Sequence, residues 1–402
     1  MVEHRILLNK LNRYGIRGNA YKWFESYLSD RKQFVTSNGS NSESLPLIYG
    51  VPQGSILGPL LFIIYINDLP NISKIARFIL YADDANILIT GNNIEEIITL
   101  TNSILEALSD WVDCNRLLLN LKKTHYMIFS RSRSISDFNI HFQINGSAIK
   151  RETETKFLGV IIDDKLTWKK HITAMKLKMS RYLGIMYKLR AQIPLKARLL
   201  IYHSFIQSHL NYCPLIWGFA AKSHIESLFS KQKSAMRAIM PGFVNYKYKD
   251  GALPTHTKNS FCEYKVLTVH GIIAKNALLL IHKIKNFNSS IPPSVSNLIE
   301  SESPCFSDFP NYETHHEWYE RYNTASFRPS FFFKGPLLSI TPDIVELLSQ
   351  PCNNKSLISC SNSLKAYLIQ QQRMGDTDQW PPFMLNKITG LRNSTRTHNS
   401  QI

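Results

Sequence analysis

The chain has 402 residues, of which 44% are hydrophobic and 11% aromatic, enough to bury a core and form two or three domains. This composition excludes a wholly disordered protein. Lys and Arg total 47 against 30 Asp and Glu, which gives a formal net charge of +17. Such a surplus favours a polyanionic partner, nucleic acid before an anionic membrane surface, over a small acidic substrate.

The sequence also indicates a compartment. Its longest strongly apolar run, residues 56–66, is too short to span a bilayer, so no membrane partner is expected. The N-terminus lacks the central apolar stretch of a secretory signal, which predicts an intracellular protein of the cytoplasm or nucleus. The six cysteines form no CxxC pair, so reduced thiols are expected rather than a disulfide framework or a zinc site.

The first element with a chemical signature is a glycine-rich turn at 50–62 (GVPQGSILGPLLF), which leads into an apolar helix that runs towards Asp68. Glycines permit a planar ligand to approach the backbone closely, and Pro59 suits the first turn of a helix. Such a turn is a weak signal when it is taken alone.

Residues 77–90 (RFILYADDANILIT) predict two β-rich strands that reverse at Asp83-Asp84. Adjacent carboxylates repel each other, and Mg²⁺, which prefers hard oxygen ligands, would relieve that repulsion. The alternative is an Asp-rich turn that only ends the strand. Spacing alone favours this alternative, because Asp163-Asp164 shows that such pairs occur elsewhere in the chain.

Downstream, residues 94–112 predict an amphipathic helix, followed by NLKKT at 120–124 and a strand at 126–129. Glu95 and Glu96 suit the first turn of that helix because they complement its dipole. The order of loop, helix, carboxylate hairpin, helix and strand predicts a mixed α and β fold.

Most of the net positive charge lies in residues 165–250, which hold 16 Lys and Arg but only two acids. Three helical patterns begin there, at Thr167, at Pro194 and near Ser223. Solvated helices usually interleave both signs, so three helices of one sign favour contact with a phosphate backbone. The predicted apolar stripes contain Trp168, Ile172, Met175 and Met179; Leu195, Leu199, Tyr202 and Ile206; and Ile225, Leu228, Phe229, Met236 and Ile239.

Four ordered motifs resemble those of reverse transcriptases from non-LTR (LINE-type, jockey-like) retrotransposons: residues 50–62, YADD at 81–84, NLKKT at 120–124, and FLGVIIDDKLTWKKHI at 157–172. Residues 4–35 are similar to the segment that precedes the glycine-rich loop in that family. The resemblance implies an α+β right-hand polymerase, in which a palm of antiparallel sheet and packed helices precedes a helical thumb and a mostly helical C-terminal appendage. It implies an RNA-directed DNA polymerase that uses Mg²⁺ (or Mn²⁺), an RNA template, a DNA primer and deoxynucleoside triphosphates.

The same resemblance implies a domain order. Residues 1–155 would be partial fingers and palm, and residues 156–243 a primer-grip hairpin with a basic helical thumb. Residues 244–390 would form a C-terminal helical and loop region, and residues 391–402 a disordered tail.

By that likeness, the carboxylate hairpin carries the catalysis. Asp83 would ligate the metals, Asp84 would assist it, and Tyr81 and Ala82 would touch the primer end. Lys123 could donate a proton to the departing pyrophosphate, although a lysine that merely faces solvent is the alternative.

Other residues would bind the substrates. Gln53 and Gly54 would border the incoming nucleotide and the template base, and Phe157, Leu158 and Gly159 would grip the primer. Phosphate contacts from the thumb would fix position rather than sequence. The expected nucleic-acid-binding residues of the thumb are Lys169, Lys170, Lys176, Lys178, Lys231, Lys233 and Arg237.

One expected element lies upstream of Met1. Family members carry a strand ending in Phe-x-Asp shortly before the residues that match Val2-Glu3-His4, and its Asp is the other bridging metal ligand. The sequence therefore predicts that this polypeptide alone lacks processive polymerase activity. Two other readings stay open: a non-catalytic nucleic-acid-binding remnant of a mobile element, and a product that does not fold.

The last third of the chain carries fewer signals. An apolar stripe at 275–285 predicts a helix. Residues 333–336 and 364–368 resemble the tail that follows the polymerase in such elements, with leucine in place of the tryptophan expected after Gly-Pro. His315-His316 could suggest a metal site, but the favoured interpretation is that both are ordinary surface residues, because adjacent histidines point apart on most backbones.

Overall fold

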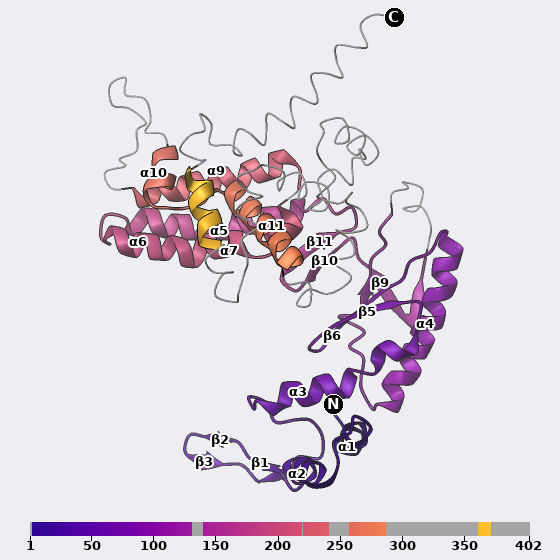
Figure 1. Ribbon diagram of the computed structural model, residues 1–402. Coiled ribbons are helices and arrows are strands. Elements are labelled where there is room, and N and C mark those ends of the chain that lie inside the picture. The colour runs from indigo at the N-terminus through magenta and orange to yellow at the C-terminus, as the bar shows by residue number, and fades with distance from the viewer. Residues whose placement is uncertain (1, 131–139, 219, 241–256, 287–360, 371–402) are drawn as a thin grey trace, which may run out of the picture. The chain divides into compact units, whose positions relative to one another are not determined.

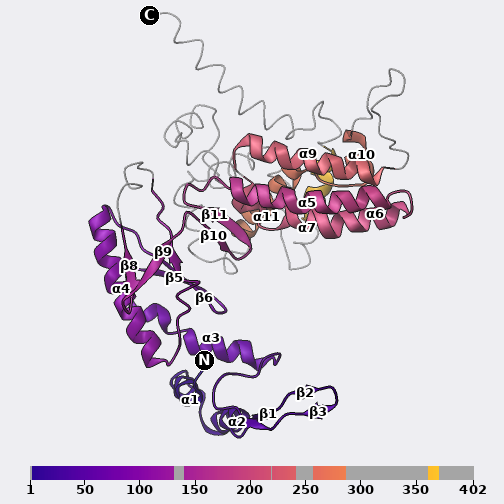
Figure 2. The same ribbon diagram turned by 180° about the vertical axis from the view of Figure 1, so that it is seen from behind.

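The computed structural model describes residues 2–130, 140–218, 220–240, 257–286 and 361–370 (Figure 1, and from behind in Figure 2). It divides into two compact units, Met1–Glu154 and Thr155–Ile402. None of the helices in these ranges has the length and apolar character that crossing a bilayer requires.

The helices of the first unit are α1 (His4–Arg13), α2 (Gly18–Leu28), α3 (Leu57–Ile66) and α4 (Ile94–Cys114), with a 3₁₀ turn at Leu69–Ile72. Side-chain caps start two of them. A Glu3 carboxylate oxygen accepts from the Ile6 N–H at 2.9 Å, and Asn93 accepts from the Glu96 N–H at 2.8 Å. Leu7, Leu28 and Leu61 are buried together, so α1, α2 and α3 share one core.

The strands of this unit form separate small sheets. An exposed arm between α2 and α3 contains β1 (Lys32–Gln33) paired with β4 (Leu45–Pro46) and β2 (Thr36–Ser37) paired with β3 (Ser40–Asn41). β5 (Arg77–Tyr81) pairs antiparallel with β6 (Asp84–Leu88). In the only three-stranded sheet of the described ranges, β9 (Ser147–Arg151) lies between β7 (His125–Tyr126) and β8 (Phe142–Ile144). The predicted α+β composition is confirmed, whereas the palm and thumb arrangement stays a prediction.

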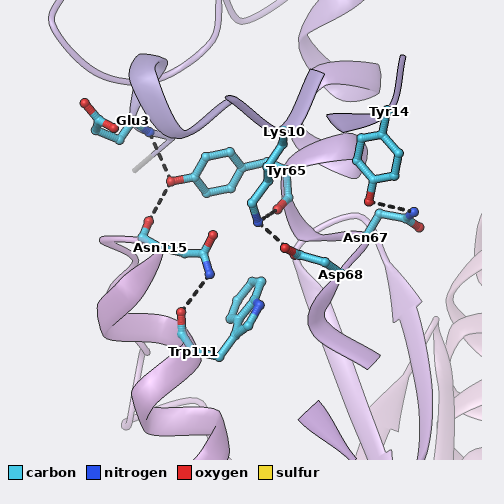
Figure 3. Close-up of polar contacts among 8 residues, drawn as sticks. All are labelled: Glu3, Lys10, Tyr14, Tyr65, Asn67, Asp68, Trp111 and Asn115. Atoms are coloured by element: carbon cyan, nitrogen blue, oxygen red, sulfur yellow. Dashed lines mark hydrogen bonds and ion pairs between the residues drawn. The ribbon is translucent and has the colours of Figure 1, made fainter. Parts of the chain in front are cut away.

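A buried polar network joins three helical segments of the first unit (Figure 3). The Tyr65 hydroxyl accepts from the Glu3 N–H at 3.4 Å and donates to the Asn115 carbonyl at 2.6 Å. The Lys10 ammonium donates to the Tyr65 carbonyl at 2.6 Å and to Asp68 at 2.7 Å. Burial lowers the pKa of Lys10, and Asp68 opposes that shift.

The described elements of the second unit are helices apart from one hairpin at its start, which consists of β10 (Glu154–Phe157) and β11 (Val160–Asp163). All three predicted basic helices are present, although the second is interrupted. The described helices of the second unit are α5 (Lys169–Leu189), α6 (Leu195–Tyr202), a π-helical turn (His203–Gln207), α7 (Ser208–Asn211), α8 (Pro214–Trp217), α9 (Lys222–Ile239), α10 (Lys258–Glu263), α11 (Val269–Asn286) and a helix over 361–370.

One hydrophobic core runs through this unit, and the predicted stripes supply it. Every residue of those stripes is either buried in the core or packed against it. Leu364 and Leu368 of the last described helix are also buried there, so the core draws on both sides of the boundary expected at 243/244. The helix expected at 275–285 begins earlier, at Val269.

Gln232 of α9 is the polar centre of this core. Its side-chain amide donates to the Tyr202 hydroxyl at 2.8 Å and the Leu267 carbonyl at 2.9 Å, and its carbonyl oxygen accepts from the Val269 N–H at 2.8 Å. These bonds connect α6, α9 and the start of α11, and the side chain is fully buried. The expectations for His315-His316, for 333–336 and for 391–402 fall outside the described residues.

Candidate active site

The carboxylate hairpin is tighter than the sequence suggested. Tyr81 pairs with Asp84, so the turn consists of only two residues, Ala82 and Asp83. Asp84 is therefore the first residue of β6 rather than part of the reversal. Ala82 has φ 51°, in the left-handed region. This conformation costs a residue with a side chain about 1–2 kcal/mol. Such strained residues cluster at functional sites.

The two faces of the hairpin differ. Phe78 and Leu80 of β5 and Ile87 of β6 pack against buried residues of the first unit. Because side chains alternate along a strand, Tyr81 and the paired Asp84 lie on the opposite face. Tyr81 is 61% exposed, and Asp84 is exposed beside it. The hairpin is thus anchored by one face while its tip and other face meet solvent.

Asp83 and Asp84 are unpaired. Among the described residues, neither carboxylate forms an ion pair or accepts a side-chain or backbone hydrogen bond. The chain's other Asp pair behaves differently. Asp163 is buried, and its two oxygens accept at 2.8 Å each from the N–H groups of Thr167 and Trp168, the two residues before α5. The alternative role, an aspartate that only serves the local backbone, therefore describes Asp163. The carboxylates of Asp83 and Asp84 remain available to a ligand.

The glycine-rich loop is fixed at both ends. The Gly50 N–H donates to the Val2 carbonyl, and the Gly50 carbonyl contacts a ring nitrogen of His4, both at 2.7 Å. At the other end, the Ser55 hydroxyl donates to the Pro52 carbonyl at 2.7 Å and accepts from the Gly58 N–H at 2.9 Å. These bonds hold the loop as a turn that leads directly into α3.

Between those fixed ends, Gln53 and Gly54 are exposed, and Gly54 has φ 77°. The two residues expected to border the nucleotide are therefore accessible to a ligand. Lys123 is exposed as well, on a tight turn where its N–H donates to the Asn120 carbonyl at 2.9 Å. Its ammonium makes no ion pair with Asp83 or Asp84, so the structure does not join it to the aspartates.

The hairpin expected to grip the primer is present in the second unit. Its turn is Leu158-Gly159, with φ 43° and 87°, as a two-residue hairpin turn of type I′ requires. The Tyr212 hydroxyl donates to the Leu158 carbonyl, and the Tyr212 ring would lie 3.2 Å from a Cβ at Gly159. Sequence reasoning missed Tyr212, because no local pattern relates it to a turn 54 residues away.

The basic residues expected to contact nucleic acid divide by exposure. Lys169, Lys170 and Lys178 of α5 are exposed. The others are half-buried, and the Lys233 ammonium lies 4.3 Å from the centre of the Phe229 ring. The half-buried residues are Lys176, Lys231, Lys233 and Arg237.

Carboxylate oxygens suit Mg²⁺, so Asp83 and Asp84 fit a divalent cation chemically. They are only two residues of one hairpin. In the ranges that the structure describes, no group of three or more His, Cys, Asp or Glu side chains could hold a metal ion. A complete two-metal centre would need a further carboxylate from another segment.

The N-terminal part of the chain matches a known protein family. Residues 1–162 match the family model described as reverse transcriptase (RNA-dependent DNA polymerase). These residues form a reverse transcriptase domain.

Curated relatives agree with this assignment. The chain is 29% identical over 231 residues to the RNA-directed DNA polymerase from mobile element jockey of Drosophila melanogaster. It is 30% identical over 236 residues to the probable RNA-directed DNA polymerase from transposon BS of the same organism. Each match covers 54% of this chain and 25% of the relative, so the chain spans about a quarter of their length. The resemblance to jockey-like non-LTR reverse transcriptases is confirmed.

The turn into α3 of the reverse transcriptase domain depends on Gly58. A Cβ there would lie 2.6 Å from the Pro52 carbonyl oxygen and 3.0 Å from the Ser55 hydroxyl. We expect Gly58→Ala to lower stability by about 1–3 kcal/mol, because the backbone must shift to admit the methyl group. Gly184→Ala is the matched control, since nothing lies within 4 Å of a Cβ on this exposed helical residue.

Thermal unfolding of the full chain measures both substitutions. Gly184→Ala should raise the midpoint slightly, because alanine favours the helix by about 1 kcal/mol over glycine. A Gly58→Ala protein as stable as the parent would contradict the close approach of Pro52 to Gly58.

Proposed function

We propose that this chain contributes to an RNA-directed DNA polymerase, with Asp83 and Asp84 as metal ligands of its nucleotidyl-transfer site. The observation that carries the proposal is the pair of exposed, unpaired carboxylates at the tip of a strained two-residue turn. The domain family and the polymerase relatives support the same chemistry. The substrates would be an RNA template, a DNA primer and deoxynucleoside triphosphates.

In this chemistry, bound Mg²⁺ or Mn²⁺ would stabilise the attacking and leaving oxygens of an in-line displacement at the nucleotide α-phosphorus. Asp83, in the turn, would be the main ligand, and Asp84 would assist from the start of β6. Tyr81, exposed on the face of Asp84, would meet the primer end together with Ala82. The anchored opposite face of the hairpin would keep these groups in position.

The remaining site residues have supporting roles in the proposal. Gln53 and Gly54 would border the incoming nucleotide and the template base, which agrees with their exposure in a loop fixed at both ends. Lys123 would protonate the departing pyrophosphate, for which its exposed ammonium is chemically suitable. Phe157, Leu158 and Gly159 would grip the primer.

Metal binding tests the role of the hairpin directly. We expect Asp83→Asn to weaken binding of Mn²⁺, measured by electron paramagnetic resonance, by about tenfold or more, because the site loses one of its two charged oxygen ligands. Asp164→Asn is the control, since it alters the other Asp pair of the chain. Equal affinities for the parent and Asp83→Asn proteins would contradict the assignment.

We further propose that this chain by itself does not extend primers processively. Two-metal catalysis needs carboxylates from more than one strand, and Asp83 and Asp84 belong to no group of three or more possible metal ligands among the described residues. Primer extension on poly(rA)/oligo(dT) with Mg²⁺ or Mn²⁺ should therefore yield no processive product. Robust synthesis that disappears in Asp83→Ala would refute this proposal while supporting the role of Asp83.

A second candidate function is nucleic-acid binding without catalysis. The observation that favours it is the basic surface of α5, which has six Lys and Arg, no acidic residue, and exposed Lys169, Lys170 and Lys178. These ammonium groups would contact phosphates and release counterions on binding.

The salt dependence of binding tests this function. We expect a triple Lys169→Gln, Lys170→Gln, Lys178→Gln variant to lose affinity for a nucleic-acid duplex. The slope of log binding constant against log salt concentration should become shallower by about 0.9 per phosphate contact removed. Asp83→Ala should leave both quantities unchanged if the basic surface acts without the metal site. An unchanged slope in the triple variant would show that these lysines make no phosphate contacts.

A further inference from the structure

An exposed aromatic ladder lies on α2 of the reverse transcriptase domain, away from the residues assigned above. The Trp23 and Tyr27 rings stack with their centres 5.4 Å apart and their planes 10° apart. The Arg31 guanidinium lies over the Tyr27 ring at 5.2 Å from its centre and donates to the Tyr27 carbonyl at 3.4 Å. Trp23 and Tyr27 are four residues apart and lie above one another on α2, whereas Arg31 follows the end of that helix, shortly before β1 (Figure 1).

The outer end of the ladder is open. Trp23 is 53% exposed, although tryptophan is one of the largest apolar side chains. Side chains on a helix lean towards its N-terminus, where Asn19 and Ala20 are exposed and short. Besides Tyr27, the Trp23 ring contacts Phe24 edge to face, with the ring centres 5.1 Å apart and the planes 86° apart, and about half of the Trp23 surface still meets solvent. The indole N–H donates to no group in the described part of the chain.

The surroundings of the ladder favour a negatively charged ligand. Arg17, Lys22 and Lys32 are exposed within six residues of it in the sequence, in addition to Arg31 within it, alongside one exposed acid at Asp30. The exposed acid of the helix, Glu25, lies two residues beyond Trp23 and so about 200° around the axis, on the opposite side. Aromatic faces next to cations are the surface that single-stranded nucleic acid uses, because bases stack on the rings and phosphates meet the charges.

We propose that Trp23, Tyr27 and Arg31 form a stacking platform for unpaired bases of single-stranded RNA. This inference rests on the proposed function, which brings an RNA template to this domain. A base would stack on the exposed part of the Trp23 ring, and Arg17 and Lys22 would contact the adjoining phosphates. Base-paired RNA does not offer a free base to the ring, so the platform selects unpaired strands.

The test compares binding of a 12-nucleotide oligoadenylate and a 12-base-pair RNA duplex to the full chain, in EDTA so that metal binding plays no part. We expect Trp23→Leu to weaken oligoadenylate binding about fivefold to tenfold, the loss expected for one stacked base. Duplex affinity and the salt slope of oligoadenylate binding should stay unchanged, because stacking removes no phosphate contact. Trp23→Phe should retain most of the affinity, since it keeps an aromatic face.

Two controls make the outcome decisive. Tyr14→Leu removes another half-exposed aromatic ring, 49% accessible, outside the ladder and should have no effect. Asp83→Asn should also leave oligoadenylate binding unchanged, so failure of the metal site and failure of the platform give different results. An unchanged affinity in Trp23→Leu, an equal loss on the duplex, or an equal loss in Tyr14→Leu would each overturn the inference.

Discussion

Apolar packing on one face of the β5–β6 hairpin is the constraint on which the candidate site depends. Phe78, Leu80 and Ile87 pack against the core, and this contact holds the hairpin without using any polar group at its tip. Asp83 and Asp84 consequently need no protein partner to be positioned. The same anchoring keeps Ala82 in a left-handed conformation that an isolated chain would leave, because both strands that flank the turn are fixed.

The two Asp pairs of this protein show how little a dipeptide reveals by itself. Asp163 is used within the fold, where its oxygens satisfy the N–H groups that precede α5. Asp83 is the second residue of the two-residue turn, and β6 begins at the next residue, Asp84. No helix start therefore follows Asp83 to offer N–H groups to its carboxylate. A carboxylate whose oxygens already accept from backbone N–H groups cannot also ligate a metal at full strength, and this physical difference separates a structural pair from a candidate catalytic pair.

Each unit is also centred on a buried polar group that joins elements far apart in the sequence. Tyr65 links the N-terminal segment to the end of α4, and Gly50 of the glycine-rich loop is bonded to the same segment through Val2. Gln232 has the corresponding role among the helices of the second unit. Buried donors and acceptors of this kind are expensive to leave unpaired, so they select one packing arrangement from those that apolar contacts alone would allow.

The sequence alone determined the helical stripes of the second unit, the presence of the carboxylate hairpin and the ordered motifs, because these depend on local periodicity, turn chemistry and spacing. It placed the reversal at Asp83-Asp84, whereas the turn is Ala82-Asp83. It predicted Asp83 and Asp84 as a pair but could not tell them from Asp163-Asp164 by spacing. Only the three-dimensional structure showed that the Asp163 carboxylate accepts hydrogen bonds from backbone N–H groups. It alone also placed Tyr212 against the Leu158-Gly159 turn. The Tyr212 contact joins residues 54 apart, so its free energy arises only when packing brings the two segments together. The Asp163 bonds reach N–H groups four and five residues further on, and they depend on the backbone conformation that the chain adopts there in the folded unit.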